Sequence, residues 1–138
     1  MFDTKLADDF EVKYVEVKLS NIPNYHTTFN INGNTIFMTV TYNTRSNCRE
    51  IILETLASEV LLSQTTVKYG RRCELNFNAT QNGLDYYVTL KPKDITKVFD
   101  SSYDYINWAD DFVLCFVGWD YSFTLRAEQN KRTYLTGN

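Results

Sequence analysis

The chain has 138 residues, of which 43% are apolar and 15% are aromatic, with only 2 Pro and 5 Gly. This length and composition indicate one globular domain and exclude a disordered, collagen-like or low-complexity chain. Fourteen Lys and Arg against 17 Asp and Glu give a net charge of −3, which argues against phosphate-driven nucleic-acid binding as the main activity.

The first ten residues contain three Asp and no apolar stretch, so we expect no signal peptide. No run of 18 or more apolar residues is present either, and we expect no membrane-spanning segment. We expect residues 1–10 to form an N-terminal arm in front of a single β domain.

Residues 12–19 alternate apolar and polar side chains, which predicts the first strand. Val15, Val17 and Leu19 share one face of this strand, and charged side chains occupy the other. Pro23 and two Asn then predict a connecting loop over residues 21–26.

Two extended runs within residues 27–42 flank the dipeptide Asn32-Gly33. Both residues tolerate positive φ, which the tight primed turn of a β-hairpin requires. The sequence therefore predicts a hairpin with its turn at Asn32 and Gly33. One of its faces is strongly apolar and should face a core; it carries Phe29, Ile31, Ile36, Met38, Val40 and Tyr42.

A polar, turn-prone segment over residues 43–47 is followed by a further strand over residues 50–56 and a short one over residues 59–62. Leu and Val side chains within residues 50–62 also recur near helical spacing, so a helix is the alternative for this stretch. We favour strands.

A second hairpin is predicted from residues 75–77 and 85–90, with the turn at Asn82-Gly83. Residues 94–99 fit either a strand or a single helical turn. The apolar run over residues 112–117 is typical of a strand covered on both faces.

A last hairpin could form from residues 121–125 and 133–135 within a C-terminal extension at residues 119–138. Turn signals every 8 to 15 residues are the spacing of an all-β domain. We therefore predict a mainly β fold, an antiparallel β-sandwich or small β-barrel with at most one or two short helices.

No arrangement for catalysis emerges from the residues. His26 is the single histidine and lies in a predicted loop, and the five Gly are isolated, so neither a catalytic triad nor a phosphate-binding loop is indicated. Three cysteines at wide spacing are expected to be reduced, structural thiols: Cys48, Cys73 and Cys115. We expect no metal, no cofactor and no enzymatic activity.

A hydrolase that uses two carboxylates is the least favoured hypothesis. Asp110 and Asp111 are adjacent, and in a strand they would point to opposite faces, so they could not share a substrate. No other pair among the 17 acidic residues is distinguished by the sequence.

Charge is unevenly distributed along the chain. Residues 91–97 hold three Lys and one Asp, whereas residues 100–120 hold five Asp and neither Lys nor Arg. If these basic and acidic sectors lie on different faces, one copy could meet the next head to tail, or a partner subunit could bind either face.

Tyr103, Tyr105 and Trp108 crowd the acidic sector and are candidates for interface contacts, because aromatic side chains dominate the centres of protein interfaces. The same three rings could instead form the stacking platform of a β-sandwich module that binds a carbohydrate or peptide.

Lys68, Arg71 and Arg72 surround Tyr69 and form a small basic and aromatic patch, a further candidate contact surface. Three basic side chains on a chain of net negative charge attract phosphates only weakly, so we do not expect nucleic-acid binding.

The order of motifs resembles a family of small phage tail proteins, the baseplate plug domain described for contractile-tailed cyanophage. The resemblance covers residues 27–117. The matching elements are Asn32-Gly33-Asn34, Tyr42-Asn43-Thr44-Arg45, Leu61-Leu62, Val67-Lys68-Tyr69-Gly70 and Val113-Leu114-Cys115-Phe116. The chain differs from the family in the residues that flank the Leu pair and in its terminal extensions.

The resemblance implies a structural subunit at the distal end of a phage tail, made in the host cytoplasm and located in the virion. Such a subunit closes the tail tube or joins it to the hub, and it carries no catalytic residues. Its partners would be other tail or baseplate proteins, or further copies of itself. We expect Asn43 and Arg45 to bond backbone groups of the turn that follows Tyr42, or else to contact a partner.

Overall fold

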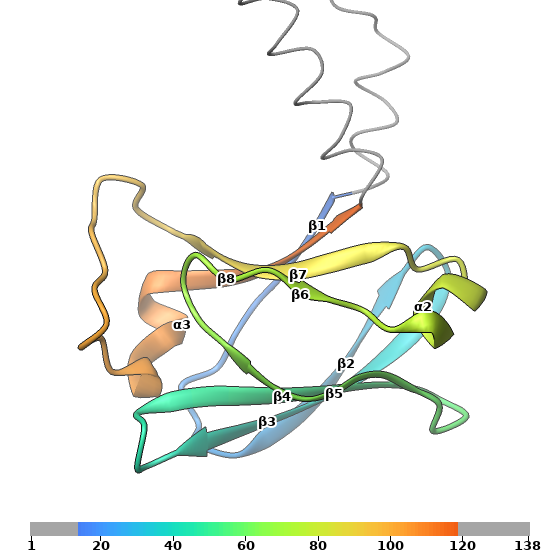
Figure 1. The fold of residues 1–138 in the computed structure, drawn as a ribbon, viewed down its shortest axis with the longest axis horizontal. Helices are drawn as coiled ribbons and strands as arrows, with labels where there is room; N and C mark the ends of the chain where they lie inside the picture. Colours follow the sequence, from blue (N-terminus) through green and yellow to red (C-terminus); the bar gives the residue numbers. More distant parts are fainter. Residues whose placement is uncertain (1–13, 119–138) are drawn as a thin grey trace, which may run out of the picture.

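A computed structural model describes residues 14–118, which form eight strands, two short helices and one 3-10 turn (Figure 1). The elements in chain order are β1 (Tyr14–Val17), β2 (Tyr25–Ile31), β3 (Asn34–Asn43), β4 (Cys48–Thr55), β5 (Val60–Val67), β6 (Cys73–Glu74), α2 (Phe77–Gln81), β7 (Tyr86–Pro92), η1 (Tyr105–Asn107), α3 (Trp108–Asp111) and β8 (Phe112–Gly118). The predicted arm, the C-terminal extension and its hairpin lie outside the described residues.

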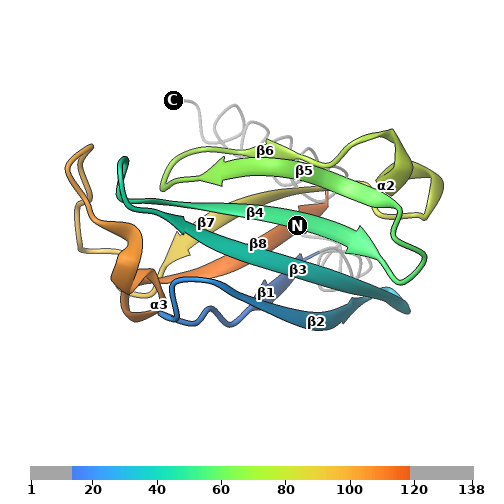
Figure 2. The same cartoon turned by 90° about the horizontal axis from the view of Figure 1, so that it is seen from below.

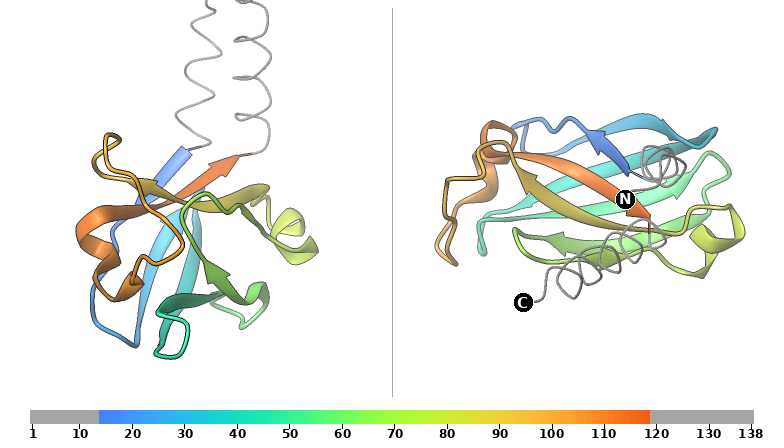
Figure 3. Two further views of the ribbon diagram at one scale, coloured as in Figure 1. Left: turned by 60° about the vertical axis from the view of Figure 1, so that its left-hand side comes forward. Right: turned by 90° about the horizontal axis from the view of Figure 1, so that it is seen from above.

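The strands form two four-stranded antiparallel sheets that pack face to face (Figures 1 and 2). One sheet has the order β1-β8-β7-β6 and the other the order β2-β3-β4-β5. Views from two further directions show the same two layers (Figure 3). The predicted mainly β fold is confirmed as a sandwich, and the described residues do not close into a barrel.

The turn of the β2–β3 hairpin forms where the sequence predicts it, but β2 begins at Tyr25, so Tyr25 and His26 belong to a strand and not to the predicted loop. Asn32 and Gly33 have φ values of 51° and 81°, so both occupy the left-handed region that a primed turn requires. The register runs from Ile31 opposite Asn34 to Tyr25 opposite Val40.

Inward-facing residues alternate with outward-facing ones along the paired strands, which produces one core between the sheets. Ile36, Met38 and Val40 of β3 are completely buried, as the apolar face of the hairpin predicts. Val17 of β1 joins the same cluster, and Leu19 packs against it. A first strand with this inward face is thereby confirmed at Tyr14–Val17, whereas residues 18 and 19 of the predicted strand lie beyond its end.

Within residues 50–62, the stretches 50–55 and 60–62 are extended strands joined by a turn, and no part is helical. Ile51 and Leu53 of β4 are buried at every second position and pair with Thr65 and Leu62 of β5. Alternating burial has a period of two, which a helix cannot satisfy. The favoured interpretation of this stretch is confirmed.

The predicted second hairpin is wrong in its middle. Strand β6 pairs with β7, but residues 77–81 form helix α2 between them. The side chain of Asn76 caps this helix by accepting a hydrogen bond from the N–H of Asn78. Asn82 and Gly83 therefore end a helix, with Gly83 at φ 72°, and do not form a two-residue strand turn.

Two further segments correct the sequence analysis. Residues 94–97 form a hydrogen-bonded turn, in which Asp94 accepts bonds from the N–H and hydroxyl of Thr96 at 3.0 and 2.6 Å. Asp110 and Asp111 belong to α3 and not to a strand.

The last described strand, β8, is buried on both faces, as predicted. Leu114 and Phe116 face the core between the sheets, whereas Cys115 and Val117 form a second cluster with Tyr87. All three cysteines are buried and unbridged, in agreement with the expected structural thiols.

Candidate interaction surface

Four connecting segments gather at one end of the sandwich, on the left in Figures 1 and 2. They are residues 18–24, 43–47, 68–72 and 93–111, and we call this end the α3 end. The opposite end, which carries the β2–β3 turn, the β4–β5 turn and α2, is called the α2 end.

The α3 end is built around Arg49, an arginine with no exposed surface at the start of β4. Its five N–H groups donate to five backbone carbonyls. The acceptors are Tyr105 O (3.0 Å), Ile22 O (2.7 Å), Pro23 O (2.9 Å), Asn21 O (3.1 Å) and Ile106 O (2.8 Å). A guanidinium offers five donors in a fixed fork, so this site uses all of them.

Aromatic rings enclose the same cation. The guanidinium carbon lies 5.2 Å from the ring centre of Tyr42 and 5.1 Å from that of Trp108. Burial lowers the pKa of Arg49, but carbonyl dipoles and ring faces stabilise the charged form. The residue thereby ties the 21–23 loop and η1 to β4.

Trp108 strengthens these ties through its own polar group. The indole Nε1–H donates to Ser20 O at 2.8 Å, and the N–H of Ala109 donates to Asn21 Oδ1 at the same distance. Loop 18–24 is therefore fixed from two sides, by β4 and by α3.

Tyr42 and Asp104 link the β3–β4 turn to η1. The phenol donates to Asp104 Oδ1 at 2.7 Å, and the carboxylate also accepts from the N–H of Ile106. The hydrogen bond to Asp104 raises the pKa of Tyr42 to about 12. The same bond holds the pKa of Asp104 below its ordinary value.

A cluster of rings packs the 99–105 segment against the beginning of β8. Phe99 lies 4.6 Å from Phe112 between ring centres, and Tyr103 lies 4.7 Å from Tyr105 in an edge-to-face arrangement. Tyr69 joins the cluster from the β5–β6 connection, 5.5 Å from Phe99. Three connections are held together by aromatic contacts.

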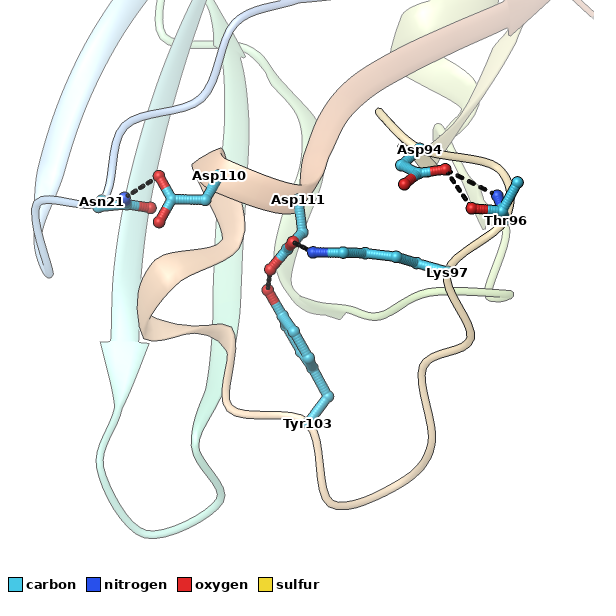
Figure 4. Close-up of polar contacts among 7 residues, drawn as sticks. All are labelled: Asn21, Asp94, Thr96, Lys97, Tyr103, Asp110 and Asp111. Carbon is cyan, nitrogen blue, oxygen red and sulfur yellow. Dashed lines mark hydrogen bonds and ion pairs between the residues drawn. The ribbon is translucent and has the colours of Figure 1, made fainter.

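The carboxylates of this end are bonded separately (Figure 4). Asp111 accepts from the Tyr103 hydroxyl at 2.6 Å and from Lys97 Nζ at 3.1 Å. These contacts, the Tyr103 hydrogen bond first, hold the pKa of Asp111 below its ordinary value. Asp110 instead accepts from the amide of Asn21 at 3.0 Å.

This arrangement corrects the expectation for the charge sectors. Lys97 of the basic sector forms an ion pair with Asp111 of the acidic sector, and the N–H of Lys93 donates to the carbonyl of Asp111. Up to residue 118, where the described part of the chain ends, the two sectors lie side by side, because the 93–104 segment folds back on α3. They cannot act as complementary poles on different faces.

Two of the three aromatic interface candidates are wrong as surface contacts. Trp108 has no exposed surface and Tyr105 is buried, while Tyr103 is half-buried. Arg49 covers the ring of Trp108, and the ring cluster covers that of Tyr105. These two rings therefore cannot form the stacking platform expected of a carbohydrate- or peptide-binding module.

The basic patch lies on the surface of the α3 end. Arg71 and Arg72 are exposed, and the guanidinium of Arg72 lies 4.9 Å from the ring centre of Tyr87. Lys68 is half-buried and lines a hollow of about 250 Å³ together with Tyr69, Phe99 and Asp100. Their role as contacts stays a prediction.

The turn after Tyr42 contains one confirmed contact. The Asn43 side chain accepts hydrogen bonds from the N–H groups of Arg45 and Ser46 at 2.9 and 3.3 Å. Asn43 therefore has the predicted folding role. Arg45 takes part with its backbone, and its side chain is exposed.

Sequence reasoning missed Arg49, although a signal was present. Arg49 is in phase with Ile51 and Leu53, so alternation along β4 places it on the inward face. A charged residue at an inward position indicates a buried polar centre. Its acceptors could not be foreseen, because they are backbone carbonyls of segments distant in the sequence.

Large apolar side chains are exposed mainly at the α3 end. Ile95 and Val98 are 84% and 92% exposed, and Ile22 and Tyr69 are exposed in neighbouring connections. The α2 end has Leu56 and Phe77, exposed by 73% and 71%.

Within residues 14–118, no group of three or more His, Cys, Asp or Glu side chains could hold a metal ion. No helix of the described part is long and apolar enough to cross a membrane. No protein-family model, no curated protein and no solved structure matches the chain.

Proposed function

We propose that this chain is a non-enzymatic structural subunit of a phage tail baseplate, which docks onto neighbouring tail proteins through its α3 end. The observation that carries the proposal is the combination at that end of exposed aliphatic side chains and a scaffold fixed by Arg49. Closing the tail tube or attaching to the hub is the assembly role that we propose.

Preorganisation supports docking at this end. Association costs less when the contacting loops are already ordered, because less conformational entropy is lost on binding. Arg49, Trp108 and the ring cluster hold the connections between strands in place. Ile95 and Val98 are then exposed within a segment that is anchored by backbone hydrogen bonds at Lys93 and at Tyr105.

A hollow at the same end combines charged and aromatic side chains. Lys68 and Asp100 line it together with Tyr69 and Phe99. An apolar centre with a charged border is the usual anatomy of a protein interface. A partner that inserts an apolar side chain here would also meet one cation and one anion.

The family resemblance supports the choice of a phage tail. Its motifs lie in the β2–β3 turn, the end of β3, strand β5 and strand β8, so they cover both sheets. The alternative, a module that binds carbohydrate or peptide, has lost the platform of Tyr105 and Trp108 on which it depended.

The proposal is tested by tagging the protein in the phage that encodes it and purifying tails by density-gradient centrifugation. We expect the tagged protein to remain with the tail fraction in a fixed ratio to the tube protein, measured by quantitative mass spectrometry. A tagged protein that stays in the soluble fraction while intact tails form would refute a virion role.

A further inference from the structure

Strand β2 forms a regular edge of its sheet. The two-residue turn makes Ile31 and Asn34 a hydrogen-bonded pair, and the bonding then alternates along the hairpin. His26, Thr28 and Asn30 therefore direct their N–H and C=O groups away from β3. Their side chains are exposed, and β2 has no second strand neighbour within the described residues (Figure 2).

The opposite edge of the same sheet is covered. Asn76 donates its N–H to Leu61 O at 2.9 Å and its side-chain amide to Val60 O at 2.8 Å. Asn78 adds a third bond, to Val60 O at 2.9 Å. Strand β5 also shifts register twice against β4. Covering and bulging of an edge both prevent further strand pairing.

Strand β2 has none of these protections. Residues 25–31 contain no Lys, Arg, Asp, Glu or Pro, and their register with β3 is unbroken. Apolar side chains are half-buried along the same side of the sandwich, where β1 and β2 lie at the ends of their sheets: Val15, Leu19, Tyr25 and Phe29. A strand added at this edge would cover part of that apolar seam.

We propose that β2 pairs antiparallel with β2 of a second copy of this chain, with Thr28 opposite the partner's Thr28. This register places His26 opposite the partner's Asn30, and it matches every outward-directed N–H with a C=O. Three hydrogen-bonded pairs supply about six backbone bonds across the twofold axis. This pairing brings no Lys, Arg, Asp or Glu side chains together, because residues 25–31 contain none of these residues.

The self-complementary spacing favours a second copy over an unrelated strand. The outward groups belong to three residues, and the register centred on Thr28 is the one that pairs all three with the same three residues of a second copy. An arm of another tail protein could use the same backbone groups, but nothing in β2 would select its register. The inference depends on the fold alone and holds whether or not the protein belongs to a tail.

A single cysteine tests the register. Residues opposite each other in a hydrogen-bonded pair lie about 5.5 Å apart between Cα atoms, within the range that a disulfide spans. In Thr28→Cys, the two introduced thiols meet on the twofold axis, and the three native cysteines are buried. We expect mild oxidation to convert most of the protein to a covalent dimer on a non-reducing gel.

Two neighbouring variants serve as controls. His26→Cys and Asn30→Cys each place one thiol opposite a residue other than itself, so neither should cross-link alone, whereas an equimolar mixture of the two should. Equal cross-linking of all three single variants would overturn the proposed register.

The association is measured separately by light scattering after size-exclusion chromatography. We expect a dimer mass for the wild type and a monomer mass for Thr28→Lys, which places two cations face to face. Thr39→Lys, on the adjacent β3 opposite His26, should remain a dimer.

The inference would be overturned if the wild-type protein were monomeric at about 100 μM and Thr28→Cys also failed to cross-link. At this concentration, even a weak dimer with a dissociation constant in the micromolar range would be well populated. A dimer that never enters tails would leave this inference intact and refute the proposed function.

Discussion

The two ends of the sandwich are held by different means. At the α2 end, amide side chains make separate single bonds, such as Asn32 to the Tyr86 hydroxyl at 2.8 Å and Asn34 to Asn82 O at 3.2 Å. At the α3 end, one buried cation joins three segments. Loss of one amide should therefore be tolerated, whereas loss of Arg49 should affect the whole end.

The largest effect is expected for Arg49→Met. Met fills similar volume but removes the Arg49 donor from five carbonyls, of which Tyr105 O keeps a second donor, the N–H of Trp108, and an unsatisfied buried polar group costs about 1–3 kcal/mol. Because water can replace some of these bonds, we expect the free energy of unfolding in urea to fall by about 3–5 kcal/mol. Arg45→Met, an exposed control, should change it by less than about 0.5 kcal/mol. If the two substitutions lowered the free energy of unfolding equally, the α3 end would not depend on Arg49 as described.

Asp111→Asn should have the next largest effect, about 1–2 kcal/mol at pH 7, because hydrogen bonds to a charged group are lost. The pKa of Asp111 is depressed in the folded state, so its contribution is present above the unfolded value of about 3.9 and is lost as pH falls through the folded value. Urea unfolding at several pH values should show the stability difference between the two proteins shrinking as the pH falls below the unfolded value of about 3.9. A constant difference across that range would contradict the role of the charge.

Tyr42→Phe removes the hydroxyl that donates to Asp104, at an exposed site, and should cost about 1 kcal/mol. The pKa of Asp104 should rise toward its ordinary value in this variant, as followed by NMR titration of the carboxyl carbon. An unchanged Asp104 titration would show that the bond does not persist in solution.

The smallest effect is expected for Asn32→Gly, at the α2 end. Gly tolerates the φ of 51° at this position, so the substitution isolates the hydrogen bond to Tyr86. We expect a loss of about 0.5–1 kcal/mol in thermal or urea unfolding. A loss comparable with that of Arg49→Met would mean that the α2 end also depends on a single residue.

Much of the fold was predictable because it is encoded locally. The Asn32-Gly33 turn and the alternation along β3 are properties of adjacent residues, and both are confirmed. Helix α2 was missed because Asn82-Gly83, which follows its last residue, is also the signal of a two-residue hairpin turn. Local signals at residues 75–83 supported both structures.

The α3 end was less predictable because its contacts are distant in sequence. Arg49 bonds residues 26 to 57 positions away, and Trp108 bonds Ser20 across 88 positions. The aromatic candidates were recognised as important, but their role was reversed: Trp108 covers a buried cation and does not present a surface. Composition identifies such rings, and only the fold decides which side they face.

Docking through the α3 end can be tested with a matched pair of double variants. Ile95→Asp with Val98→Asp places charges on exposed aliphatic positions of the α3 end, and Leu56→Asp with Phe77→Asp does the same at the α2 end. Both proteins should fold with wild-type circular dichroism, since all four side chains are exposed. Incorporation into purified tails should fall at least tenfold for the first pair and stay near wild type for the second. Equal incorporation of the two double variants, or a selective loss for the α2-end pair, would show that the α3 end is not the docking surface.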